Sequence, residues 1–155
     1  MKNIVIGILG LASLAFVSPA VAQEVITPEM LEGADTERGA RWFIRCRSCH
    51  TLGEDERDKQ GPNLWKLFDR RAGEFESFAE GRIGYSQALI DADFVWTVDR
   101  LNEWLIKPKD FLPGNKMQFA GLNKEEQRIQ LIAYLMEATG YSLANPADDA
   151  EPAAE

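Results

Sequence analysis

The sequence has few of the residues that bind structural metals. Its 155 residues include two cysteines and one histidine. Three such ligands are too few for a structural zinc site, which takes four Cys or His side chains. The strong alternation of apolar and polar residues that marks a half-buried strand is also missing, as are internal repeats. The remaining pattern predicts a single all-α domain with long loops.

Long apolar runs are absent too, except at the N-terminus. Residues 4–17 form an apolar run behind Lys2, and residues 20–22, Ala-Val-Ala, fit a small-x-small cleavage pattern. We therefore predict a cleaved Sec-type signal peptide over residues 1–22 and a mature chain that begins at Gln23. The run is short for a transmembrane helix, so an uncleaved anchor is the less favoured alternative. Export through such a signal would place a bacterial protein in the periplasm, with no integral membrane span after cleavage.

The formal charge is strongly negative, at −8 for the full chain. Loss of Lys2 with the signal peptide makes it more negative still. This charge argues against nucleic acid and anionic membranes as partners. The C-terminal residues 142–155 are acidic and rich in Pro and Ala, a composition typical of a disordered tail. Basic residues instead surround the two cysteines: Arg38, Arg41, Arg45, Arg47, Arg57, Lys59, Lys66, Arg70 and Arg71.

Both cysteines and the only histidine fall in one pentapeptide, Cys46-Arg47-Ser48-Cys49-His50. C-x-x-C-H is the attachment signature of a c-type haem, in which two thiols add to the porphyrin vinyl groups and the imidazole binds the iron. On a helix, positions i, i+3 and i+4 share a face, so all three side chains would point toward one flat group. We therefore predict one haem c, bound covalently through Cys46 and Cys49, with His50 as an iron ligand.

Two other interpretations of the pentapeptide are open. A thioredoxin-like dithiol needs a strand–turn–helix context, and no strand is predicted before Cys46. A disulfide between Cys46 and Cys49 would suit an oxidising compartment, but it would leave the adjacent His50 as a coincidence. Haem attachment accounts for all three side chains and is the preferred interpretation.

Capping residues and helical periodicity predict three principal helices. Their expected starts and ends are Asp35 or Thr36 to the cysteine motif, Thr97 to Lys107, and Asn123 to Gly140. Asn123 and Glu126 form a capping-box-like pattern at the start of the last helix. A brief helix is expected within residues 86–91. Residues 111–119 form an unusually apolar loop, which we expect to lie against an apolar group such as a porphyrin face.

The iron of such a haem needs a sixth ligand if it is to be closed to small molecules. A methionine thioether would close the site and raise its potential. The candidates are Met30, Met117 and Met136. Met136 lies in the last predicted helix, where core packing is the usual role, and Met30 has no loop to carry it across the haem. Met117 follows Pro-Gly in the apolar loop, far enough beyond His50 to reach the opposite face, and is preferred over a methionine that merely packs on the core.

These features together resemble class I cytochromes c of the mitochondrial and purple-bacterial type. The matching residues, in chain order, are Gly39…Phe43, Cys46-x-x-Cys49-His50, Gly61-Pro62-Asn63-Leu64, Arg70, Tyr85-Ser86, Trp96, Leu101, Pro108, Pro113-Gly114-x-Lys116-Met117-x-Phe119-x-Gly121 and Leu131-Ile132-Ala133-Tyr134-Leu135. The resemblance implies the class I cytochrome c fold over residues 36–141, with helices and long loops wrapped around one haem. An N-terminal extension (23–35) would precede this domain and the acidic tail (142–155) would follow it.

The resemblance also implies roles for residues around the haem. Pro62 would accept a hydrogen bond from the second ring N–H of His50 and so orient the imidazole. Tyr85 and Trp96 would donate hydrogen bonds to a haem propionate, with core packing as the alternative for both. Arg70 would help to neutralise the propionate.

Two helices would cross closely in this fold. Gly39 and Phe43 share a helix face, and a glycine there allows another helix to approach. By the resemblance, they would pack against Leu131 and Tyr134 of the last helix.

The sequence departs from the family pattern at three pocket positions and in one loop. Trp104 stands where the family often has Tyr, Leu89 where it has Asn, and Asn115 where it has Thr. Several extra residues lie between Gly73 and Tyr85, in the stretch that covers the propionate edge. These changes leave ligation intact but bear on the redox potential, which hydrogen bonds around a metal site tune.

The implied function is that of a monomeric one-electron carrier. A haem iron with His and Met ligands has no vacant site, so it would cycle between ferric and ferrous states rather than act as an enzyme. Its partners would be respiratory, photosynthetic or dehydrogenase redox proteins, docking over a small and transient contact. Lysines steer such docking in the family, and the residues at or near those positions are Arg45, Lys109, Lys116 and Lys124. The alternatives are a haem enzyme or small-gas binder with an open sixth position, and a carrier subunit held in a dehydrogenase or oxidase complex.

Overall fold

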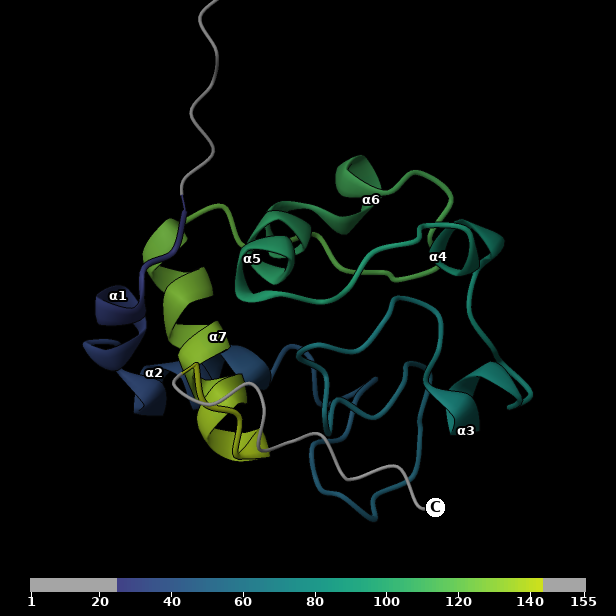
Figure 1. Cartoon of the computed structure of the whole chain (residues 1–155), viewed down its shortest axis with the longest axis horizontal. Helices are drawn as coiled ribbons and strands as arrows, with labels where there is room; N and C mark the ends of the chain where they lie inside the picture. The colour runs from purple at the N-terminus through teal and green to yellow at the C-terminus, as the bar shows by residue number, and fades with distance from the viewer. Residues whose placement is uncertain (1–24, 144–155) are drawn as a thin grey trace, which may run out of the picture.

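A computed structural model describes residues 25–143, which form seven helices joined by long loops (Figure 1). The helices are α1 (Pro28–Glu32), α2 (Thr36–Phe43), α3 (Glu76–Ala79), α4 (Gln87–Ile90), α5 (Val98–Ile106), α6 (Pro108–Phe111) and α7 (Glu125–Thr139). Within this range there is no strand, so the all-α prediction is confirmed. No helix of residues 25–143 has the length and apolar character needed to cross a bilayer. The predicted signal peptide and all but the first two residues of the predicted tail lie outside the described residues.

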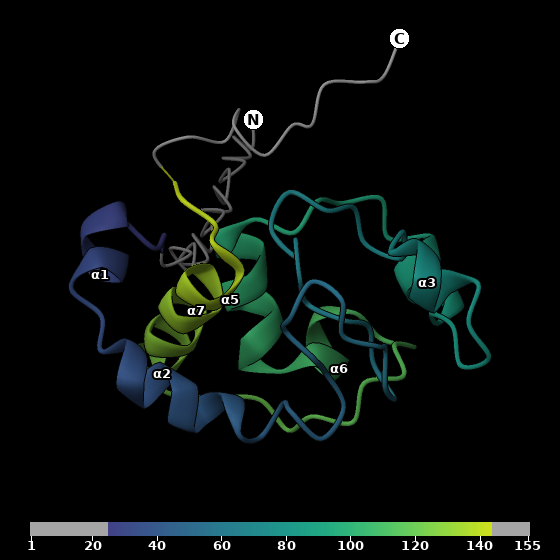
Figure 2. The same cartoon turned by 90° about the horizontal axis from the view of Figure 1, so that it is seen from below.

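The crossing of α2 and α7 is the main helix–helix contact, and both views show the two helices side by side (Figures 1 and 2). Gly39 makes it possible, because a Cβ at this position would overlap the Gln130 carbonyl oxygen and lie 2.6 Å from the Tyr134 Cβ. One turn along α2, the Phe43 ring packs on the Tyr134 ring with centroids 5.7 Å apart. The predicted crossing of the first and last principal helices is therefore confirmed.

Side chains cap the two earlier principal helices as predicted. The Asp35 carboxylate accepts a hydrogen bond from the Arg38 backbone N–H at 2.9 Å, and the Thr97 hydroxyl accepts one from the Arg100 N–H at 3.1 Å. The Ser86 hydroxyl caps α4 in the same way. These bonds satisfy N–H groups that have no partner inside the helix.

The predicted capping box of the last helix is wrong. Lys124 occupies the N-cap position of α7 and makes no side-chain cap. The buried Arg128 organises this end instead. Its guanidinium donates to the Asn102 side chain of α5 at 2.6 Å and to the backbone oxygens of Leu122 and Asn123 at 2.9 and 3.1 Å. Gly140 ends α7 in the left-handed conformation, as predicted.

Three short helices have no counterpart among the predicted ones. Proline occupies the first turn of α1 and of α6, where its missing N–H costs nothing. Pro108 therefore ends α5, as predicted, and also begins α6. The third, α3, lies in the extra residues between Gly73 and Tyr85, at the opposite side of the molecule from α1 (Figures 1 and 2).

Candidate functional site

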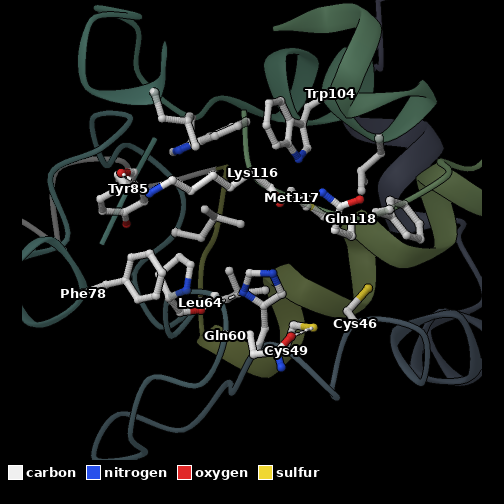
Figure 3. Close-up of a pocket in the computed structure, with 18 of the residues that line it drawn as sticks. Cys46, Cys49, Gln60, Leu64, Phe78, Tyr85, Trp104, Lys116, Met117 and Gln118 are labelled. Carbon is white, nitrogen blue, oxygen red and sulfur yellow. Dashed lines mark hydrogen bonds between the residues drawn. The ribbon is translucent and has the colours of Figure 1, made fainter. Parts of the chain in front are cut away.

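A largely apolar cavity of about 260 Å³ lies between α2, α5, α7 and the long loops. The cysteine motif forms one wall, and the loop that follows α6 forms the facing wall. Figure 3 shows Cys46, Cys49 and Gln60 on one side, with Trp104 and Met117 across the cavity from them. Leu67, Leu101 and other buried aliphatic side chains complete the lining. An apolar cavity with a few convergent polar groups is the usual form of a cofactor site.

The cysteine motif lies in tight turns just beyond α2 rather than within a helix. α2 ends at Phe43, three residues before the first cysteine. Backbone hydrogen bonds nevertheless keep helical spacing, since the N–H groups of Cys49 and His50 donate to the Cys46 oxygen at 2.9 and 3.0 Å. The expectation of a helix running into the motif is thus corrected, while the shared face of the three side chains is preserved. All three line the cavity.

His50 is held from two directions. Its Nδ1 lies 2.7 Å from the Pro62 carbonyl oxygen, which is the contact that the resemblance implied. Its ring also lies against Gly61, where a Cβ would be 2.8 Å from Nε2. Burial lowers the pKa of His50, and the positive charge of Arg70 lowers it further. The hydrogen bond to Pro62 acts in the opposite direction and raises the pKa. The imidazole is therefore oriented and biased toward its neutral, metal-binding form.

The two cysteines carry free thiols at the cavity wall, so the structure contains no disulfide between them. Burial raises the pKa of the Cys46 thiol to about 11. Such a thiol is a poor dithiol–disulfide catalyst, because the thiolate is the reactive form in that chemistry. The Cys49 thiol has a polar neighbour, since its Sγ lies 3.7 Å from the Gln60 Oε1.

Met117 is the methionine that the structure brings to the cavity. Met30 lies in a separate groove between α1 and α7, and Met136 packs on the core away from the cavity lining. The backbone around Met117 is fixed by the buried Asn115 side chain. Asn115 accepts from the Met117 N–H at 3.0 Å and donates to the oxygens of Pro108 and Leu112 at 2.7 Å each. Of the predicted apolar loop over residues 111–119, residues 116–119 line the cavity, whereas Phe111 is the last residue of α6.

Arg70 and Tyr85 form a polar end of the cavity. Arg70 Nη1 donates to the Asn63 oxygen at 3.1 Å, but its buried Nε has no hydrogen-bond partner among the described residues. Burial lowers the pKa of Arg70. Burial also raises the pKa of Tyr85, whereas the positive charge of Arg70 and a hydrogen bond with the Phe75 backbone lower it. A partly buried cation with a spare, buried N–H and a neutral phenol are suited to receive an anionic group at this end.

Trp96 lines the cavity as well, in contact with other aromatic rings. Its ring meets Trp104 edge to face at a centroid distance of 5.2 Å and Phe94 at 4.8 Å. Trp96 therefore packs against neighbouring aromatic rings at the edge of the cavity. The structure brings all eight predicted site residues, Cys46, Cys49, His50, Pro62, Arg70, Tyr85, Trp96 and Met117, to the lining of one cavity.

These residues fit a haem. The two cysteine thiols and the His50 imidazole share one wall of the cavity, and the Met117 thioether lies on the facing wall. The lining between them is largely apolar, and the Arg70 Nε–H lies at one end without a hydrogen-bond partner among the described residues. In a haem c, the vinyl edge is attached to cysteine sulfurs, and the negatively charged propionate edge is stabilised by a nearby cation. The cavity has a sulfur end and a cationic end that match these two edges. Phe78 and Gln60 also line the cavity and are not among the predicted site residues. Phe78 is a buried residue of the short helix α3, and Gln60 is an exposed residue of the loop after the cysteine motif, so neither segment carries a sequence pattern that marks it as part of the site.

Comparison with known proteins agrees with this geometry. Cytochrome c of Chlamydomonas reinhardtii is 45% identical over 106 residues, covering 68% of this chain and 90% of that protein. Cytochrome c of Stellaria longipes is 43% identical over 106 residues, covering 68% of this chain and 94% of that protein. Cytochrome c of Theileria parva is 39% identical over 117 residues, covering 75% and 93%. The chain belongs to the cytochrome c family. No protein-family model matches it.

Membership of the cytochrome c family makes this a haem c protein that carries electrons. The three departures from the family pattern now have places in the structure. Trp104 is buried with its indole nitrogen directed into the cavity (Figure 3). Leu89 lines the cavity with an aliphatic side chain at the position where the family pattern has Asn. Asn115 supports the Met117 loop from behind.

The four basic residues predicted to steer docking are exposed. Two of them are tethered, since Lys109 Nζ donates to the Asn115 oxygen at 2.6 Å and Lys116 Nζ donates to the Tyr85 oxygen at 3.2 Å. The Arg45 guanidinium lies 5.7 Å from the centroid of the Phe119 ring. Arg45 and Lys116 line the same cavity as the thiols, so positive charge is present at its mouth.

Proposed function

We propose that this cytochrome c holds one haem covalently through Cys46 and Cys49, with His50 and Met117 as the iron ligands. The observation that carries the proposal is that the cysteine motif and the distant Met117 line a single apolar cavity. Covalent attachment needs both thiols on one side of the group, and closure of the iron needs ligands on both faces. Both requirements are supported by the cavity lining, in which the thiols and His50 belong to one segment and Met117 to another.

The protein's own residues have distinct tasks in electron transfer. When bound, the haem supplies an iron that gains and loses one electron. The Pro62 carbonyl fixes the orientation of the His50 imidazole, and Asn115 fixes the backbone that carries Met117. Buried apolar side chains around the cavity exclude water and so disfavour the more highly charged ferric site. Fixed ligands keep the geometry of the two redox states similar, which favours rapid electron exchange.

We further propose that the mature protein works in the periplasm as a monomeric carrier between redox proteins. The support is the signal-peptide pattern of residues 1–22 and the positive charge at the cavity mouth on an acidic chain. Partners would dock at this mouth through Arg45, Lys109, Lys116 and Lys124. A small polar contact of this kind is suited to rapid release.

The competing function is a haem enzyme or gas binder with an open sixth position. The two functions differ in one optical test. If Met117 ligates the iron, the ferric protein has a weak sulfur-to-iron band at the red end of the visible spectrum and the ferrous protein binds carbon monoxide slowly. Met117→Ala should remove the band and give fast carbon monoxide binding. Met136→Ala, a core methionine, is the matched control and should change neither. An unchanged spectrum in Met117→Ala would exclude Met117 as the ligand.

A further inference from the structure

The extra residues between Gly73 and Tyr85 cover the polar end of the haem cavity. We call residues 74–84, which include α3, the lid segment. Its Phe78 is buried at 5% exposure, lines the cavity, and packs edge to face on Tyr85 at a centroid distance of 4.9 Å. Figure 3 shows Phe78 and Tyr85 at the end of the cavity away from Cys46. A haem attached at its vinyl edge to the cysteines would direct its propionates toward this end.

One carboxylate joins the lid segment to the loop that orients His50. Asp58 uses both oxygens: Oδ2 accepts from the Ser77 hydroxyl at 2.6 Å, and Oδ1 accepts from the Asn63 backbone N–H at 2.7 Å. Asn63 directly follows Pro62, whose carbonyl binds the His50 ring. Asp58 therefore connects the loop that ends at Asn63 with the lid segment, although residues 64–73 separate these two parts in the sequence.

A second path closes the connection into a ring. The Asn63 backbone oxygen accepts from Arg70 Nη1 at 3.1 Å, and the Arg70 guanidinium carbon lies 4.4 Å from the centroid of the Phe75 ring in the lid segment. Asn63 is thus held at its N–H by Asp58 and at its oxygen by Arg70, and each of these residues contacts the lid segment. Asn63 is almost fully buried, with an exposure of 1%.

Electrostatics agree with a central place for this carboxylate. Burial is the main influence on the pKa of both Arg70 and Tyr85, and in both cases the Asp58 charge favours the protonated form. Asp58 is half-buried, so its charge is only partly screened by solvent.

We propose that Asp58 is a positioning residue that fastens the lid segment over the polar end of the cavity and, through Asn63, sets the Pro62 carbonyl against His50. This inference rests on the proposed function in taking His50 as an iron ligand. It assigns a role to the extra loop, which closes one end of the site, and to a carboxylate that touches neither iron ligand.

The test compares Asp58→Ala, Asp58→Asn and Ser77→Ala in the haem-loaded protein. Hydrogen exchange of residues 74–84 should become about tenfold faster in Asp58→Ala and in Ser77→Ala, since each loses a hydrogen bond to a charged group. The His50 ring N–H resonance of the ferrous protein should shift in Asp58→Ala only. Asp58→Asn can keep both contacts, because its amide can accept from Asn63 and donate to the Ser77 hydroxyl, so it should restore both readouts.

Asp55→Asn, an exposed carboxylate in the same loop, is the control and should change neither readout. Two results would overturn the proposal: lid exchange at the wild-type rate in Asp58→Ala, or a His50 shift as large in Asp55→Asn as in Asp58→Ala. Asp58→Asn removes the charge of Asp58 but keeps its contacts. If the midpoint potential changes equally in Asp58→Asn and Asp58→Ala, that change is therefore due to the lost charge and not to the lost contacts. The mass of the loaded protein tests haem attachment separately, and its outcome does not depend on Asp58.

Discussion

At the scale of single residues, the environment of His50 is set by backbone groups. A carbonyl from Pro62 lies 2.7 Å from Nδ1, and the Cα of Gly61 leaves just enough space for the ring. Neither group is a side chain that could rotate away. The imidazole is therefore positioned by the fold itself. Its placement depends most strongly on Gly61, because any side chain at that position would clash with the ring.

Gly61→Ala tests this packing. The new Cβ would lie 2.8 Å from Nε2 and 2.9 Å from Nδ1 of His50, so the ring has to shift. We expect the free energy of unfolding of the haem-loaded protein to fall by about 1–3 kcal/mol, as overpacking of a tight site does. Denaturant unfolding followed by haem absorbance measures it. Gly33→Ala, where the nearest atom to a Cβ is 3.3 Å away, is the control. Equal losses in both variants would contradict the account.

At the scale of elements, long helices and short helices have different origins. The α5 and α7 segments have apolar periodicity, and Asp35 and Thr97 cap their helices through bonds three residues away, so they can be predicted from the sequence. Helices of four or five residues are too short to be stable alone. The α1 and α3 helices depend on distant partners: the backbone N–H of Ile26, just before α1, donates to Asp99 at 3.0 Å, and Phe78 of α3 packs on Tyr85.

The same distinction separates the parts of the site. The cysteine motif is local, and its haem chemistry can be predicted from five residues. Asp58 and Asn63 act through hydrogen bonds to segments that fold onto them, and a polar loop gives no sign of this. The start of α7 was mispredicted for a related reason, because a buried Arg128 replaces the local cap with bonds to α5 and to the preceding loop.

Arg128→Met tests that replacement. The variant would leave the Asn102 side-chain oxygen and the oxygens of Leu122 and Asn123 without their donor. We expect a loss of about 3 kcal/mol in the free energy of unfolding, because buried acceptors deprived of a charged donor are costly. Thermal and denaturant unfolding would measure it. Arg41→Met on the exposed side of α2 should stay within about 0.5 kcal/mol of the parent protein.

At the scale of the whole molecule, charge is distributed unevenly. The chain has a net charge of −8, while Arg45 and Lys116 lie at the mouth of the cavity. A carrier of this kind would present a basic docking site on an acidic body. Like charges elsewhere on the surface would repel an acidic partner, so the distribution would also orient the encounter.

The dependence of electron transfer on salt tests this distribution. With an acidic redox partner, we expect the second-order rate constant to fall as ionic strength rises, because screening weakens the attraction. Lys124→Gln should lower the rate at low salt and reduce its salt dependence. Lys66→Gln, an exposed lysine outside the predicted docking set, is the control. A rate that rises with salt would contradict a basic docking site.

Covalent haem attachment is the central claim, and mass spectrometry of the mature protein tests it most directly. Digestion should give a peptide containing Cys46, Cys49 and His50 whose mass exceeds that of its amino acids by one haem, with neither thiol open to alkylation. A peptide that has only its amino-acid mass and takes up two alkyl groups would contradict the account.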